Sequence, residues 1–172
     1  MAEEILRHAP CPVLTVGPGV CGHAKLPGLY HNGSKLAPVE LDLHSIVYAT
    51  NFTAASLTVA PVTISLAAQL QARLTVMHVV EGDSRLGSLP EPGEDEIRKL
   101  REEVSKASLP CAPEILTEFG SAWRCVVNKV TDLEADLVVL GAHPADRTTH
   151  LPWSTVHQVV AHASCPVLTV RA

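Results

Sequence analysis

The chain has 172 residues, with 13 basic and 18 acidic side chains and a formal net charge of -5. This length is typical of one domain, and the acidic balance argues against a protein that binds the phosphate backbone of nucleic acids. No apolar stretch is long enough to cross a membrane. The odd set of five cysteines, without a CxxC pair, indicates reduced thiols and a cytoplasmic protein rather than a disulfide framework.

The two ends of the chain carry the same short segment. Residues 8–16 read HAPCPVLTV and residues 162–170 read HASCPVLTV, so eight of nine positions are identical. Each copy follows a short helical pattern and runs through Cys-Pro into an apolar stretch typical of a strand. We interpret residues 1–16 as the closing helix and strand of a preceding domain. Residues 17–42, which begin with a Gly- and Pro-rich stretch, are interpreted as a linker, and residues 43–172 as one complete domain, the second half of a tandem.

Strand and helix patterns alternate through this domain. Continuous apolar runs predict strands at 46–49, 74–80, 115–119, 137–140 and 167–170. Helical periodicity predicts helices over about 59–70, 94–107, 121–130 and 155–163. In the first of these helices we expect Val59, Val62, Leu66 and Leu70 on the buried face, with Pro61 near the start.

This alternation implies right-handed crossovers and an open, doubly wound, five-stranded parallel sheet with helices on both faces. A ligand crevice is expected beyond the carboxyl ends of the strands. We also expect the extra N-terminal strand to pair antiparallel with the last strand, within one chain or between two chains, and so to cover an exposed sheet edge. The residues expected in this pairing are Val13, Leu14, Val16, Val167, Leu168 and Val170, and the first three are expected to become buried.

Three segments resemble the universal stress protein family: IVYATNFTAAS, LTVMHVVEG, and ADLVVLGAHPADRTTHLPWSTVHQVVAHASCPVLTV. The resemblance covers residues 43–172 and the separate segment 2–16. It implies the adenine-nucleotide alpha-hydrolase-like fold, pairing of domains through the last strand, and an ATP-binding loop after the fourth strand. That loop has the pattern Gly, two residues, Gly, nine residues, Gly, then Ser or Thr, in which backbone amides approach the phosphates.

The chain departs from this pattern at three positions. The motif falls on Gly141, Pro144, Ser154 and Thr155, so the second and third of its three glycines are replaced. Pro144 also removes a backbone donor. Asn51 stands where ATP-binding relatives carry an aspartate. If the site is retained, the resemblance implies that the nucleotide is bound by Asn51, Val79, Gly141, Arg147, Ser154, Thr155 and Val156. Thr155 has the alternative role of a helix N-cap, and Val79 that of a core residue.

These departures favour a stress-response adaptor that binds ATP weakly or not at all. The alternative is a functional ATP-binding stress sensor, with magnesium as its metal and slow hydrolysis. No Walker, HExxH or GxSxG motif is present, so we expect no enzyme and assign no catalytic residue. We expect no metal site at Cys21, His23 and His31, whose spacing does not suit one. A second class of function is assembly, as a homodimer or an intramolecular pseudo-dimer through the last strand.

Overall fold

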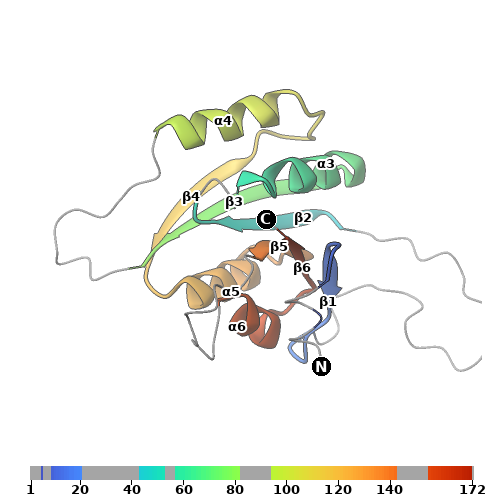
Figure 1. Cartoon of the computed structure of the whole chain (residues 1–172), viewed down its shortest axis with the longest axis vertical. Coiled ribbons are helices and arrows are strands. Elements are labelled where there is room, and N and C mark those ends of the chain that lie inside the picture. The colour runs from blue at the N-terminus through green and yellow to red at the C-terminus, as the bar shows by residue number, and fades with distance from the viewer. Residues whose placement is uncertain are drawn as a thin grey trace, which may run out of the picture.

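The computed structural model describes residues 5, 9–20, 43–52, 57–81, 94–142 and 155–171. In chain order the elements are β1 (Val13–Thr15), β2 (Ser45–Thr50), α3 (Ala60–Leu70), β3 (Arg73–Val80), α4 (Glu94–Ser105), β4 (Glu114–Phe119), α5 (Ala122–Asp132), β5 (Leu137–Ala142), α6 (Thr155–His162) and β6 (Val167–Arg171) (Figure 1). They form one sheet with the strand order β1-β6-β5-β2-β3-β4. Strands β2 to β6 are parallel, and β1 runs antiparallel to β6. The predicted doubly wound sheet and its extra strand are therefore confirmed.

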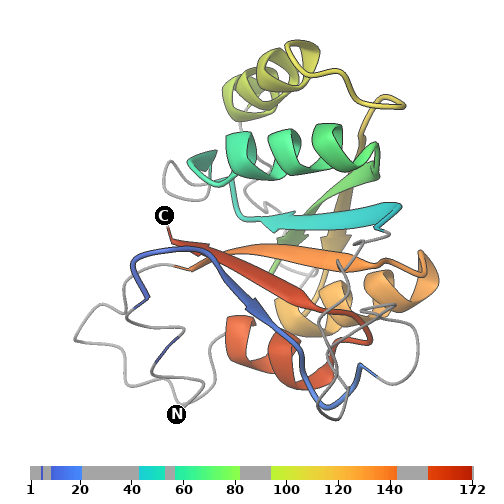
Figure 2. The same ribbon diagram turned by 90° about the vertical axis from the view of Figure 1, so that its right-hand side faces the viewer.

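Helices cover both faces of the sheet, as Figures 1 and 2 show. Helices α3 and α4 pack on one face, where their buried residues join Ile46, Tyr48 and Leu74 in one apolar cluster. Helices α5 and α6 pack on the other face around Val47 and Val138. Because both faces are covered, the central strands are apolar at nearly every position rather than at alternate positions.

Helix α3 buries part of the face that was expected, together with residues beside it. Its buried residues are Ala60, Thr63, Ile64 and Ala67, whereas Val62 is 42% exposed. Leu66 and Leu70 are only partly buried at the margin of the cluster. Val59 is fully buried, as expected, so the expectation was wrong for Val62 alone. The expected place of Pro61 in the first turn is confirmed.

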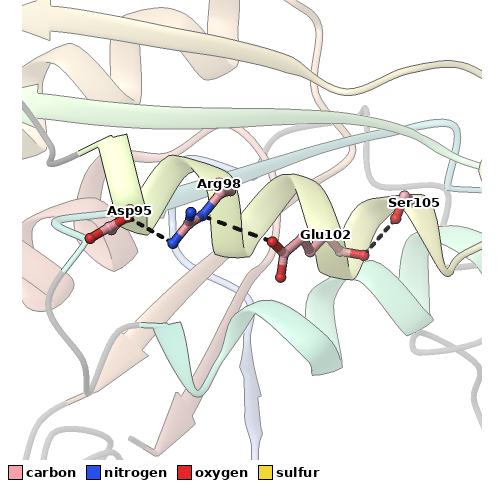
Figure 3. Close-up of polar contacts among 4 residues, drawn as sticks. All are labelled: Asp95, Arg98, Glu102 and Ser105. Carbon is pink, nitrogen blue, oxygen red and sulfur yellow. Dashed lines mark hydrogen bonds and ion pairs between the residues drawn. The ribbon is translucent and has the colours of Figure 1, made fainter.

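Helix α4 shows how unequal the two sides of a surface helix are. Its inner side buries Leu100 almost completely, which contributes about 2 kcal/mol of hydrophobic stabilisation. On its outer side Arg98 pairs with Asp95 at 2.8 Å and approaches Glu102 at 3.9 Å (Figure 3). These exposed pairs contribute about 0.3 kcal/mol each. The helix is therefore held by its apolar side, and its ion pairs add little.

The amino end of the sheet is fastened by Asp136, which directly precedes β5. Its carboxylate accepts hydrogen bonds from the backbone N–H groups of His44 at 2.9 Å and Ser45 at 3.0 Å. The backbone N–H of Asp136 in turn donates to the Ser45 carbonyl at 2.8 Å. This clip fixes the start of β2 against the start of β5 and thereby sets the register of the two central strands.

Candidate functional site

Several residues of the expected nucleotide site lie together at the carboxyl edge of the sheet. Thr50 is opposite His78 on β3, and Ala49 is opposite Leu140 on β5. The next residue of the central strand, Asn51, therefore emerges between the neighbouring strands that carry Val79 and Gly141. Asn51 is exposed, and the other two are half-buried. The structure thus brings together three of the residues expected from the sequence.

The two first residues of α6 complete the described part of this edge. Thr155 and Val156 begin the helix and are half-buried, and Val156 packs against the cluster beneath α5 and α6. Since α6 follows the carboxyl end of β5, its N-terminus faces the same edge. Arg147, Ser154 and Pro144 lie outside the described residues.

The conformation of Asn51 is fixed by three residues that the sequence analysis did not single out. Phe52 has a left-handed backbone, with φ of 56°, and its N–H donates to the Thr50 hydroxyl oxygen at 3.1 Å. The Phe52 ring is 95% buried and meets the His78 ring edge-on at 5.3 Å. His78 also contacts the Thr50 carbonyl through Nδ1 at 3.0 Å. A carbonyl only accepts hydrogen bonds, so Nδ1 carries the proton.

Together these contacts bend the chain sharply after β2 and leave Asn51 facing solvent. A histidine within an otherwise apolar strand was the sequence signal for this arrangement. Tyr48, which is on β2 like Thr50, is also buried and carries a polar hydroxyl group. Burial raises the pKa of Tyr48, and a hydrogen bond with the Thr50 side chain opposes that shift.

A carboxylate occupies the N-terminus of α5 at the same edge. Ser121 lies at the N-cap position, as expected, but its side chain makes no capping hydrogen bond. Instead Glu81, the residue after β3, accepts a hydrogen bond from the Ala122 N–H at 2.9 Å. A negative charge is favourable there because the helix dipole is positive at its N-terminus. Of the described residues that directly follow a parallel strand, which are Asn51, Glu81 and Gly120, only Glu81 is charged.

The thiol of Cys125 lies one turn into α5, close to this carboxylate. Its sulfur approaches the Phe119 carbonyl at 3.8 Å. Burial raises the pKa of Cys125 first, and the charges of Glu118 and Glu81 raise it further. The thiol is therefore protonated at neutral pH and is a poor nucleophile.

The second expected site, the edge of β6, is occupied by β1 within the same chain. Val13 lies opposite Thr169, Leu14 opposite Leu168, and Thr15 opposite Val167. The Thr169 hydroxyl also donates to the Val13 carbonyl at 3.2 Å. The predicted antiparallel pairing of the extra strand with the last strand is confirmed, whereas Val16 and Val170, which were also expected in it, lie outside this register.

The expected burial of this strand is only partly correct. Val13 is half-buried, but Leu14 and Val16 remain 46% and 42% exposed. Their burial was a wrong expectation because α3 packs over β2 and β3 and does not extend across the outer strands (Figure 2).

Within the described ranges, no three His, Cys, Asp or Glu side chains gather closely enough to hold a metal ion. Cys21, His23 and His31 lie outside these ranges. In the part of the chain that the structure describes, no helix has the length and apolar composition needed to cross a bilayer.

Known proteins with similar sequences carry one family description. Universal stress protein G of Salmonella typhimurium is 50% identical over 54 residues, which are 31% of this chain and 37% of that protein. The same protein from Salmonella typhi matches to the same extent. The match thus spans little more than a third of the length of these curated relatives.

Solved structures extend the comparison to the whole fold. A universal stress protein crystallised in complex with cAMP has a TM-score of 0.63 at 17% identity, over 75% of this chain and 97% of that chain. A universal stress protein from Archaeoglobus fulgidus has a TM-score of 0.67 at 16% identity, over 99% of this chain but 53% of its own. At sequence identities of 17% and 16%, the similarity to these two structures shows the fold alone. The model of the Universal stress protein family itself matches residues 43–171, and the chain therefore belongs to this family.

Proposed function

We propose that this chain is a stress-response adaptor whose adenine-nucleotide loop has degenerated, so that it binds ATP weakly or not at all. The observation that carries the proposal is the charge at the carboxyl edge. The Glu81 carboxylate, which directly follows β3, occupies the N-terminus of α5 at this edge. The N-terminus of α5, with its free N–H groups and positive dipole, would otherwise attract an anionic ligand. With Glu81 in place, the ligand meets a negative charge there instead.

The size of this effect can be estimated. A carboxylate within about 5 Å of a phosphate charge costs about 1 to 3 kcal/mol at the effective dielectric constants of a protein surface. That corresponds to a loss of about five- to 150-fold in affinity. The sequence adds a second penalty, because Pro144 and Ser154 replace glycines of the phosphate loop. A proline has no amide hydrogen to donate to a phosphate.

The second candidate is a nucleotide sensor, which binds ATP and hydrolyses it slowly if it does so at all. It is favoured by the retained Gly141 and Thr155 and by the open position of Asn51. The similar structure that contains cAMP suggests a further ligand of this class. A cyclic monophosphate carries one negative charge and depends less on a long phosphate loop than ATP does. Magnesium would enter only with ATP.

The experiment is a calorimetric titration of the full chain with Mg-ATP and, separately, with cAMP. The variants are Glu81→Gln, Arg147→Ala and Thr155→Ala, and Glu103→Gln on the outer side of α4 is the matched control. Millimolar or weaker binding of ATP by the wild type, strengthened at least fivefold in Glu81→Gln and unchanged in Glu103→Gln, supports the degenerate site. Micromolar ATP binding that Thr155→Ala or Arg147→Ala abolishes overturns the proposal in favour of the sensor.

The domain organisation is part of the same proposal. We propose that residues 1–16 correspond to the end of a preceding universal stress domain, so that this chain is the second half of a tandem in the cytoplasm. Ala9 donates its N–H to the Ile5 carbonyl at 2.8 Å, and Ala163 donates to Val159 at the same distance. These two bonds occupy equivalent places in the repeated segment. The Archaeoglobus structure, of which this chain covers about half, is consistent with such a tandem.

A further inference from the structure

Strands β1 and β6 are related by a local twofold axis. The four residues 13–16 and the four residues 167–170 both read VLTV. Leu14 lies opposite Leu168, its own equivalent in the repeat. Val13 lies opposite Thr169, the equivalent of Thr15, and Thr15 lies opposite Val167, the equivalent of Val13. A self-complementary pairing of this kind is the mark of an isologous interface between two copies of one surface.

The twofold relation extends beyond the strands. Arg171 donates from its guanidinium to the Ala9 carbonyl at 3.4 Å, so the end of β6 reaches the helix end that precedes β1. In the opposite direction, Gly17 and Gly19 lie against the carbonyls of Val160 and Ala163 at the end of α6. A residue that follows β1 thus contacts the segment before β6, and the last residue of β6 contacts the segment before β1.

The two halves differ at one decisive position. Gly17 corresponds to Arg171 in the repeat. A Cβ atom at Gly17 would lie 2.0 Å from the Val160 carbonyl oxygen, and one at Gly19 would lie 2.7 Å from the Ala163 oxygen. Both distances are far below a van der Waals contact, so this close approach to α6 requires glycine. The arginine that follows β6 in a second copy of the chain cannot make it.

We propose that residues 9–20 are a built-in competitor that closes the edge of β6 against a second copy of this chain. The strand β6 of a second copy presents the same VLTV residues, so it reproduces the ladder contacts that β1 makes. Two features favour the internal segment. It is covalently attached, so its pairing with β6 is intramolecular, and it has Gly17 where the second copy has Arg171. Release of residues 9–20 exposes β6 and allows two chains to join through it. The inference does not depend on nucleotide binding.

The test compares the full-length chain with Gly17→Arg, which gives the internal segment the residue found after β6. Gly19→Val is a second, independent variant, and Cys11→Ser, at an exposed position of the same segment, is the matched control. Sedimentation equilibrium in reducing buffer measures the oligomeric state, and hydrogen exchange measures the protection of residues 13–15 and 167–171. We expect a monomer for the wild type and the control. For both glycine variants we expect dimerisation at least ten times tighter, loss of protection at residues 13–15 and retained protection at residues 167–171.

A further variant identifies the strand that joins the copies. Leu168 lies on the local axis, so in a β6-to-β6 dimer the two Leu168 side chains face each other. Leu168→Lys combined with Gly17→Arg should return the chain to a monomer, because two introduced positive charges then meet at the axis. The proposal is overturned if the glycine variants stay monomeric with residues 167–171 unprotected. It is also overturned if the wild-type chain is a dimer in which both segments are protected, since the segment would then join copies rather than separate them.

Discussion

A carboxylate and a thiol lie close together at each end of the parallel sheet, but the two ends enclose them differently. At the amino end Asp136 accepts two backbone hydrogen bonds, and Cys165 is only 3% exposed. At the carboxyl end Glu81 is exposed and accepts one such bond, while Cys125 is half-buried. At the amino end the carboxylate thus holds two backbone groups and the thiol is buried. At the carboxyl end both groups are more accessible to solvent.

The loops explain this difference. Three connections at the amino end are short: residues 71–72, 133–136 and 163–166. Three connections at the carboxyl end are long: residues 51–59, 81–93 and 143–154. Short loops are satisfied by the adjacent backbone, whereas long loops carry variable, ligand-facing residues. The position of an acid on the sheet, and not its chemistry, therefore decides whether it stabilises the fold or faces the site.

The largest expected effect is at the amino end. Asp136→Ala should lower the free energy of unfolding by about 2 to 4 kcal/mol, because two N–H groups lose a charged acceptor. Urea denaturation measures the change. Asp132→Ala, an exposed acid at the end of α5, is the control and should change stability by about 0.5 kcal/mol or less. Equal losses in the two variants would show that the clip on β2 contributes nothing.

The next effect concerns the thiol beside this clip. Burial raises the pKa of Cys165 to about 12, and the charge of Asp136 adds to the shift. Between pH 9 and 12 the unfolded chain loses this proton and the native chain retains it. The contribution of the protonated thiol to the free energy of unfolding is therefore fully present below pH 9. It falls by about 1.4 kcal/mol per pH unit as the pH rises above that value. Urea denaturation at pH 9 and 10 should show this loss, and Cys165→Ala should remove it. An unchanged slope in the variant would contradict the assignment.

A smaller effect is expected at the bend after β2, on the accessible side. Thr50→Val removes the acceptor of the Phe52 N–H within a buried contact and should cost about 1 kcal/mol. Thr117→Val, at an exposed position of β4, is the matched control and should be nearly neutral. If the bend also positions Asn51, hydrogen exchange should accelerate at Phe52 in the first variant alone. No difference between the variants would show that the left-handed turn is held by the Phe52 ring instead.

The sequence predicted most of the fold, because its information is local and periodic. The apolar runs located every parallel strand, and the repeat located the pairing of β1 with β6. It did not predict that Val62 of α3 stays exposed while Ala60 and Ala67 are buried, since helical spacing does not show how closely each side of a helix lies against the sheet. Nor did it single out Glu81 or His78, whose roles come from contacts with Ala122 and Thr50, 41 and 28 residues away in sequence. Such contacts depend on register, which no short motif encodes.

The smallest expected effect tests the charge of the accessible acid alone. Glu81→Gln keeps an oxygen that can accept from the Ala122 N–H but removes the negative charge, so stability should change by about 0.5 kcal/mol or less. The pKa of Cys125 should fall, since the Glu81 charge is one of the causes that raise it. A lower pKa means more thiolate, so labelling of Cys125 by a disulfide reagent at pH 8, followed by mass spectrometry, should accelerate by less than about threefold. Glu103→Gln on α4 should leave the rate unchanged, and Cys165 should stay unlabelled in both variants. Slower labelling of Cys125 in Glu81→Gln would mean that the carboxylate exposes the thiol rather than suppressing its ionisation. The carboxyl end would then resemble the amino end in using its acid to hold the structure.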